Sequence, residues 1–171
     1  MDYCFSSAGS QAIDIFIIMR KNTEKLIVRT LEKDHIEDFI TLIDLFEKVF
    51  EMQDFKRPET EYLLNLLSKP GFKAIAGYMN GEIVAGATIY VLDQYNSTRP
   101  LAYIYDLAVS NEHQRKGIGK SVMEYIRTHY KSLGFEEVFV QADEDEDHVL
   151  KFYRSTFPTE EEKVRHFNYR L

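Results

Sequence analysis

The sequence predicts an α+β (mixed α/β) domain in which a central, mostly antiparallel sheet is flanked by helices. Three observations support this fold class. Short segments rich in β-branched and aromatic residues alternate with segments of helical periodicity, an Asn80-Gly81 dipeptide joins two strand-like segments, and helices separate the last strands. The chain has 171 residues, of which 44% are hydrophobic, enough for one domain with a buried core.

The first half of the chain contains one strand, two helices and a hairpin. We expect these elements, in order, over residues 25–32, 34–50, 59–71, 72–79 and 82–92. Apolar residues of the longer helix recur three or four positions apart from Ile36 to Phe46, and Asp34 is its candidate N-cap. Asn80-Gly81 is the dipeptide favoured in two-residue hairpin turns, so the two strands around it should pair.

The second half alternates strands with helices. We expect a strand, a helix that ends near residue 133, a strand, a short helix and a closing strand. The three strands are expected at residues 101–109, 136–142 and 163–171, and the short helix at residues 148–156. Gly134 is the expected C-terminal stop of the longer helix.

Acidic residues outnumber basic ones, 28 to 21, which gives a net charge of −7. This balance argues against nucleic acid as a partner and is compatible with a cationic ligand. The single cysteine, Cys4, excludes an internal disulfide framework and fits a reducing compartment. No cluster of His, Asp or Glu has convincing metal-ligand spacing, so no metal is expected.

The first 22 residues are expected to form an N-terminal extension, a tail or a peripheral strand, ahead of a domain over residues 23–171. The apolar run at 12–19 is too short to span a bilayer and contains Asp14. A secretory signal would need a basic start, but the first cation is Arg20. We therefore expect a cytoplasmic protein with no membrane partner.

The junction Gln114-Arg115-Lys116-Gly117-Ile118-Gly119 follows the strand at 101–109 and opens a helix. Backbone N–H groups at the start of a helix lack internal partners, and glycines let that backbone approach an anion closely. Arg115 and Lys116 would add positive charge. The junction therefore fits a phosphate-binding loop. The two glycines taken alone would fit an ordinary strand-to-helix turn equally well. It is neither a nucleoside-triphosphate loop nor a GxGxxG motif.

Gln-x-x-Gly-x-Gly after a "DLAV" strand resembles the acetyl-CoA signature of the GNAT superfamily of N-acetyltransferases. The order of strands and helices is also similar to that family from about residue 25 to residue 171. The resemblance implies a GNAT fold whose sheet is splayed at the acetyl-CoA site, with the CoA pyrophosphate on the loop and the pantetheine arm along the preceding strand. On this basis the cofactor-binding residues are Leu107, Ala108, Val109, Gln114, Arg115, Lys116, Gly117, Ile118, Gly119 and Lys120.

Four segments, "DLFEKVF", "YIYDLAVSNEHQRKGIG", "VFVQADEDED" and "KVRHF", resemble the type I aminoglycoside 3-N-acetyltransferases in the same order. The resemblance implies acetylation of the 3-amino group of the 2-deoxystreptamine ring of gentamicin-like antibiotics, antibiotic resistance and a homodimer. After Tyr153 the chain departs from the family, because Arg154-Ser155-Thr156-Phe157-Pro158 stands where a Lys-Leu-Gly-type helix end is expected. The loop at this helix end should therefore differ from that of the family.

Acetyl transfer to an amine needs a neutral amine, a donor to the developing oxyanion and a proton for the departing thiolate. We expect direct transfer in a ternary complex, with no covalent intermediate on Cys4. A backbone N–H near Leu107 or Ala108 is the expected oxyanion donor. The resemblance places Tyr153 opposite the CoA sulfur, where it is the candidate general acid; the alternative is a core tyrosine on an amphipathic helix.

The acidic stretch Asp143, Glu144, Asp145 and Glu146 follows a strand at the expected open end of the sheet, and Asp106 adds a carboxylate on the cofactor strand. Aminoglycosides are polycations, which such carboxylates would attract and orient; a solvated loop is the alternative. We prefer Asp143 to Asp106 as the group that accepts the amine proton. Acetylation of polyamines or protein amines, and an acyl-CoA-binding module without turnover, stay open as alternative functions.

Overall fold

The computed structural model describes residues 15–19 and 25–171, and in this part of the chain it contains six strands and four α-helices. The strands are β1 (Ile15–Met19), β2 (Lys25–Leu31), β3 (Phe72–Met79), β4 (Glu82–Leu92), β5 (Leu101–Val109) and β6 (Glu137–Val140). The helices are α1 (Ile36–Val49), α2 (Thr60–Leu67), α3 (Ile118–Ser132) and α4 (Asp147–Arg154). Cys4 lies outside the described residues. The chain forms two compact units, of which the first ends at Gln141 and the second is Ala142–Leu171.

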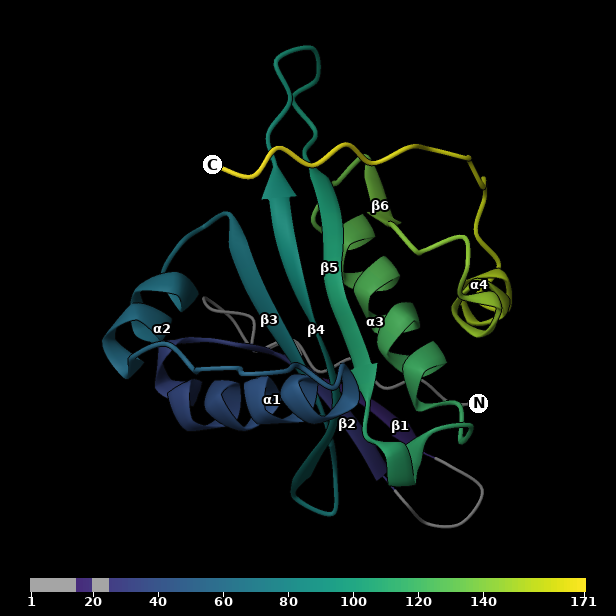
Figure 1. Cartoon of the computed structure of the whole chain (residues 1–171). Helices are drawn as coiled ribbons and strands as arrows, with labels where there is room; N and C mark the ends of the chain where they lie inside the picture. Colours follow the sequence, from purple (N-terminus) through teal and green to yellow (C-terminus); the bar gives the residue numbers. More distant parts are fainter. Residues whose placement is uncertain (1–14, 20–24) are drawn as a thin grey trace. The chain divides into compact units, whose positions relative to one another are not determined.

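The six strands form one sheet in sequence order. Neighbours from β1 to β5 are antiparallel, and β5 pairs with β6 in parallel, as the ribbon in Figure 1 shows. The predicted mixed, mostly antiparallel sheet is confirmed. Strand β1 pairs with β2 from Ile15↔Arg29 to Met19↔Lys25, so part of the expected N-terminal extension is an edge strand of the sheet.

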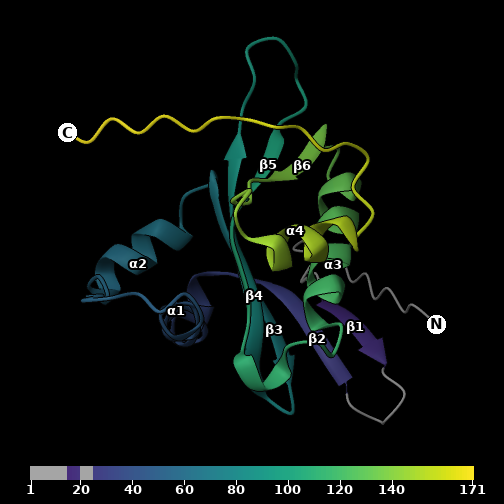
Figure 2. The ribbon, with the colours of Figure 1, turned by 45° about the vertical axis from the view of Figure 1, so that its right-hand side comes forward.

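Within the first unit, α1 and α2 lie on one face of the sheet and α3 on the other (Figure 2). Leu42 of α1 is fully buried over Gly86 of β4. A Cβ at Gly86 would meet the carbonyl oxygen of Ile75 and the Cδ1 of Leu42, so glycine at this position lets α1 approach the sheet. On the opposite face, Val122 and Ile126 of α3 are fully buried.

Local sequence signals explain most element ends. Asn80 and Gly81 both have positive φ, 52° and 86°, which confirms the predicted hairpin turn between β3 and β4. The prediction that Asp34 caps α1 is wrong. The chain leaves β2 through one 3₁₀ turn, Lys33–His35, and Asp34 lies inside it, while the Glu32 N–H donates to His35 Nδ1 at 3.0 Å.

In the second unit, α4 is followed by a segment without helix or strand. The prediction of a strand at 163–171 is wrong, because this stretch pairs with no strand among the described residues. Its apolar side chains, Val164, Phe167, Tyr169 and Leu171, are exposed. Alternation of apolar and polar residues makes a segment suitable for a sheet edge, but a strand forms only where a neighbouring backbone supplies hydrogen bonds.

Candidate active site

The junction between β5 and α3 is a tight loop with two left-handed residues. Arg115 has φ 58°, and Gly117, the N-cap of α3, has φ 78°. This conformation suits glycine and is uncommon for arginine, so the loop holds Arg115 in a backbone state of higher energy. Turns of this kind direct backbone N–H groups into a concavity, and at the N-terminus of a 15-residue helix they favour an anion.

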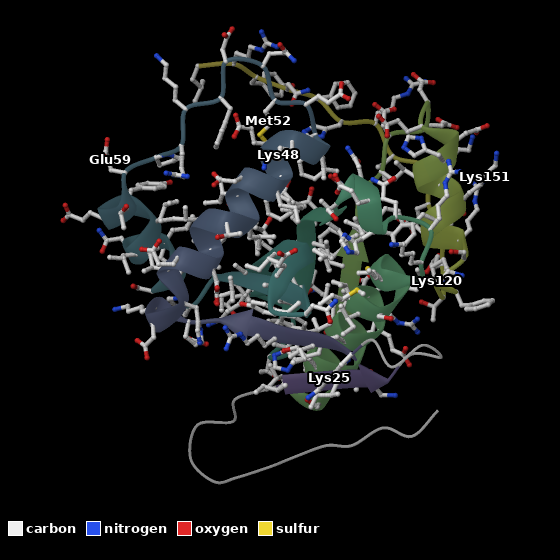
Figure 3. The ribbon with its side chains drawn as sticks, turned by 90° about the horizontal axis from the view of Figure 1, so that it is seen from below. Lys25, Lys48, Met52, Glu59, Lys120 and Lys151 are labelled. Carbon is white, nitrogen blue, oxygen red and sulfur yellow. The ribbon has the colours of Figure 1, made fainter. Side chains whose placement is uncertain are left out.

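Hydrogen bonds of Gln114 and the burial of Ile118 hold this loop in place. Gln114 Nε2 donates to the carbonyl oxygen of Val109 at 3.2 Å and to Asn111 Oδ1 at 3.0 Å. Ile118 is buried in the core and anchors the first turn of α3, so its backbone is the part that can face a ligand. Lys120 is exposed one residue after Gly119 and is labelled in Figure 3.

Strand β5 has an unpaired edge beside this loop. Residues 107–109 pair with residues 85–87 of β4, whereas the parallel pairing with β6 ends at Ile104↔Val140. Beyond Ile104, the second edge of β5 therefore meets no strand among the described residues. This confirms the splayed sheet. Along this edge, residues 107–109 pair with no strand among the described residues, an arrangement that suits an extended ligand.

A β-bulge in β5 places two consecutive side chains on one face of the sheet. Thr88 of β4 pairs with Asp106, but the next residue, Ile89, pairs with Ile104, so Tyr105 is an extra residue in β5. In a regular strand, Tyr105 and Asp106 would point to opposite faces. Because of the bulge, both line the same pocket.

This pocket of about 210 Å³ lies between α1, α2, the segment that joins them, and strands β3, β4 and β5. Figure 3 labels Lys48 near the end of α1, Met52 within the joining segment and Glu59 just before α2. The wall is mostly aromatic and aliphatic, with a few polar groups at one side. Its lining residues are Phe39, Ile43, Phe46, Met52, Phe55, Pro58, Tyr62, Leu63, Leu66, Phe72, Thr88, Tyr90, Tyr105 and Asp106. The volume is below the roughly 300–1,000 Å³ of a drug-sized ligand site, so it can take part of a ligand.

Asp106 is the carboxylate of this pocket. It is half-buried, and burial raises its pKa above the ordinary value, while a hydrogen bond from Thr88 works in the opposite direction. The Thr88 hydroxyl donates to Asp106 Oδ2 at 2.5 Å. Oδ1 makes no hydrogen bond to another described side chain and is available to a ligand. The arrangement offers a carboxylate with increased proton affinity in a mostly apolar wall.

The acidic stretch and Tyr153 belong to the second unit. Asp143, Glu144, Asp145 and Glu146 are exposed. Asp143 Oδ1 accepts a hydrogen bond from the Asp145 N–H at 3.1 Å, and Glu144 pairs with Lys163 at 2.5 Å. Tyr153 on α4 packs edge to face on Phe152, with ring centroids 5.0 Å apart. The roles of Tyr153 and of these carboxylates stay predictions.

Sequence reasoning found Asp106 but not the pocket around it. Thr88, Tyr90 and Tyr105 were not among the predicted site residues, although all three line the pocket with Asp106. The alternation in "YIYD" places Tyr103 and Tyr105 on one face and Asp106 on the other, and only the bulge changes this pattern. No local signal marks a bulge at Tyr105.

A sheet that splays beside a glycine-bearing turn at the start of a helix is the arrangement expected of a protein that binds an acyl-CoA. The chain belongs to the acetyltransferase (GNAT) family, whose family model matches residues 39–157. Acetyl-CoA is the acetyl donor in this family. Among the described residues, no group of three or more His, Cys, Asp or Glu side chains is placed to hold a metal ion, and no helix is both long and apolar enough to cross a bilayer.

Solved structures from uncultured soil metagenomic samples resemble this chain. The aminoglycoside acetyltransferase meta-AAC0020, in complex with sisomicin, is 49% identical with a TM-score of 0.84, and the match covers 85% of this chain and 96% of that one. The same protein in complex with trehalose gives 50% identity and a TM-score of 0.83 over the same shares. The aminoglycoside acetyltransferase HMB0005 is 33% identical, with a TM-score of 0.78 over 85% and 98% of the two chains.

A more distant structure, the aminoglycoside N-acetyltransferase AAC(6')-Iy in complex with CoA, is 14% identical with a TM-score of 0.69 and shares the fold alone. The match covers 89% of this chain and 99% of that one. Comparison with curated protein sequences gave no significant match.

Proposed function

We propose that this protein transfers the acetyl group of acetyl-CoA to the 3-amino group of the 2-deoxystreptamine ring of aminoglycosides and thereby confers resistance to them. The observation that carries the proposal is the half-buried carboxylate of Asp106 in a pocket next to the unpaired edge of β5. Relatives that are 49% and 33% identical are aminoglycoside acetyltransferases, which supports the same acceptor class here.

The donor side uses the loop and the β5 edge. The turn at Arg115 and Gly117 would hold the pyrophosphate of CoA through backbone N–H groups and the positive end of α3. The backbone of 107–109 would pair with the pantetheine arm. A backbone N–H near Leu107 or Ala108 would then donate to the thioester oxygen as negative charge develops on it.

The acceptor side uses Asp106. The attacking amine must lose a proton first, and Asp106 Oδ1 is the pocket atom available to accept it, directly or through water. The nitrogen lone pair then forms a bond to the acetyl carbon, and the carbonyl electron pair moves to oxygen. As the carbonyl re-forms, the C–S bond breaks with its electron pair on sulfur, and the second proton leaves the nitrogen for solvent water. Tyr153 is the proposed donor of the proton that converts the thiolate to the thiol, and its phenolate then takes a proton back from water.

Polycationic acceptors suit the charge of the chain. The net charge is −7, and Asp143, Glu144, Asp145 and Glu146 form an exposed acidic stretch that can attract ammonium groups at long range. We therefore assign Asp143 to substrate attraction and Asp106 to contact with the reacting amine. This assignment reverses the sequence-based preference for Asp143 as the proton acceptor.

Thiol release from acetyl-CoA with a panel of amines tests the proposal. We expect turnover on sisomicin and gentamicin, and NMR of the product should place the acetyl group on the 3-amino nitrogen. Acetylation at another amino group would refute the 3-position assignment. Turnover on spermidine or peptides alone would point to the polyamine or protein-amine alternative, and CoA binding without turnover to a non-catalytic module. Minimum inhibitory concentrations in a sensitive bacterial host would test the role in resistance.

A further inference from the structure

Four aromatic side chains form a continuous row across the end of the sheet beside the pocket. They are Tyr90 of β4, Tyr103 and Tyr105 of β5, and Phe139 of β6, strands that lie next to one another in Figure 1. The row follows the strand register, since Tyr103 pairs with Tyr90 on one side and with Phe139 on the other. Ring centroids are 5.4 Å apart for Tyr90 and Tyr105, 5.9 Å for Tyr103 and Tyr105, and 4.9 Å for Tyr103 and Phe139.

This aromatic row continues the pocket. Tyr90 and Tyr105 line the pocket together with Asp106, and the row then leads away from it toward β6. Tyr105 is 61% exposed and Tyr90 is 37% exposed, so the described protein leaves much of their surface uncovered. Rings buried only to this extent carry an unfavourable contact with water that a ligand could relieve.

We propose that the aromatic row is a second subsite of the acceptor site, which holds an ammonium-bearing sugar ring of a polycationic acceptor over the face of Tyr105. The inference rests on the proposed function. The pocket of about 210 Å³ takes only part of a multi-ring acceptor, so the remaining rings must lie outside it. The aromatic row begins beside the Asp106 carboxylate, so it is the surface on which the remaining rings would lie.

The chemistry of the row favours a cationic sugar over an apolar protein surface. The faces of tyrosine rings attract ammonium groups through the ring quadrupole, and apolar C–H groups of a sugar ring pack on the same faces. The Asp106 carboxylate lies at the pocket end, and the Gln141 amide oxygen accepts a hydrogen bond from the Tyr103 hydroxyl at 3.2 Å at the other. Both are acceptor oxygens, so the ends of the row suit ammonium and hydroxyl donors.

Calorimetry on the full chain with CoA present tests the subsite. The variant Tyr105→Leu keeps apolar bulk but removes the ring, Tyr105→Phe keeps the ring, and Tyr95→Leu is the control because Tyr95 is fully exposed on the β4–β5 loop. We expect Tyr105→Leu to weaken sisomicin binding by about 2- to 30-fold, the range of one cation–π contact. Tyr105→Phe should stay within about twofold of the parent. Binding of 2-deoxystreptamine alone, which has one ring, should weaken less than binding of sisomicin, because this ring would occupy the first pocket, where Tyr105 is one wall residue among many.

Each other outcome overturns the inference. Equal sisomicin binding by Tyr105→Leu and Tyr95→Leu would show that the aromatic row does not contact the acceptor. Turnover of sisomicin by the parent enzyme would then still support the proposed function. An equal loss for 2-deoxystreptamine would mean that Tyr105 acts only as a wall residue of the first pocket and that the row is no second subsite. A change from dimer to monomer in Tyr105→Leu, measured by light scattering, would make the row an interface between two copies. A parent that neither binds nor acetylates sisomicin would refute the proposed function and this subsite with it.

Discussion

Asp106→Asn is expected to make the protein more stable and less active at the same time. The substitution keeps the size of the side chain, and an amide oxygen can still accept the hydrogen bond from Thr88. It removes the negative charge and the ability to accept a proton. If Asp106 only binds an ammonium group, the loss in kcat/KM corresponds to about 1.5–3 kcal/mol, or about 10- to 150-fold. If it also takes the amine proton, kcat itself should fall by about 10²- to 10⁴-fold.

The stability effect follows from the raised pKa of Asp106. Burial favours the protonated form in the folded protein, so the stabilising contribution of this carboxyl is fully present below its unfolded pKa, 3.8, and is lost as the pH rises through its folded pKa. At pH 7 the charged carboxylate therefore costs free energy that an amide does not. We expect Asp106→Asn to melt at a higher temperature than the parent at pH 7, and this gain should shrink as the pH is lowered.

Initial rates of thiol release and thermal unfolding followed by circular dichroism between pH 4 and pH 8 measure both effects. Asp93→Asn removes the same charge at an exposed position on the β4–β5 loop and serves as the control. Asp143→Asn tests the other carboxylate: it should raise the aminoglycoside KM in a salt-dependent way and leave kcat unchanged. An Asp106→Asn enzyme with parental kcat/KM, or a larger kcat loss in Asp143→Asn, would refute the assignment of Asp106 as the proton acceptor.

Three further predictions concern the loop, α4 and the core. Gly117→Val should raise the KM for acetyl-CoA much more than the KM for the acceptor, because Gly117 has φ 78° and its backbone faces the expected pyrophosphate; unchanged CoA affinity by calorimetry would exclude this loop. Tyr153→Phe should lower kcat by about 10²-fold with little change in either KM, and a kcat within about twofold of the parent would make Tyr153 a packing residue. Gly86→Ala should destabilise by about 1–3 kcal/mol in urea denaturation, whereas Gly71→Ala, whose added Cβ would lie 3.8 Å from its nearest neighbour, should not.

The sequence by itself determined the features that depend on neighbouring residues in the chain. The Asn80-Gly81 turn, strands β3, β4 and β5, and the glycine-bearing loop before α3 were all predicted with nearly their observed ends. Each depends on local conformational preference: positive φ in the turn, β-branched and aromatic residues in the strands, and glycine at the helix N-cap.

The tertiary structure decided the features that depend on pairing between distant segments. The bulge at Tyr105 exists because β5 is one residue longer than β4 between two paired positions, and it turns Asp106 into the same pocket as Tyr105. Residues 163–171 alternate as a strand does but have no strand partner among the described residues. The alternation of residues along a strand shows which side chains can share a face of the sheet. The neighbouring strand and the pairing register determine which of them do, because a shift of one residue reverses the face of every side chain that follows.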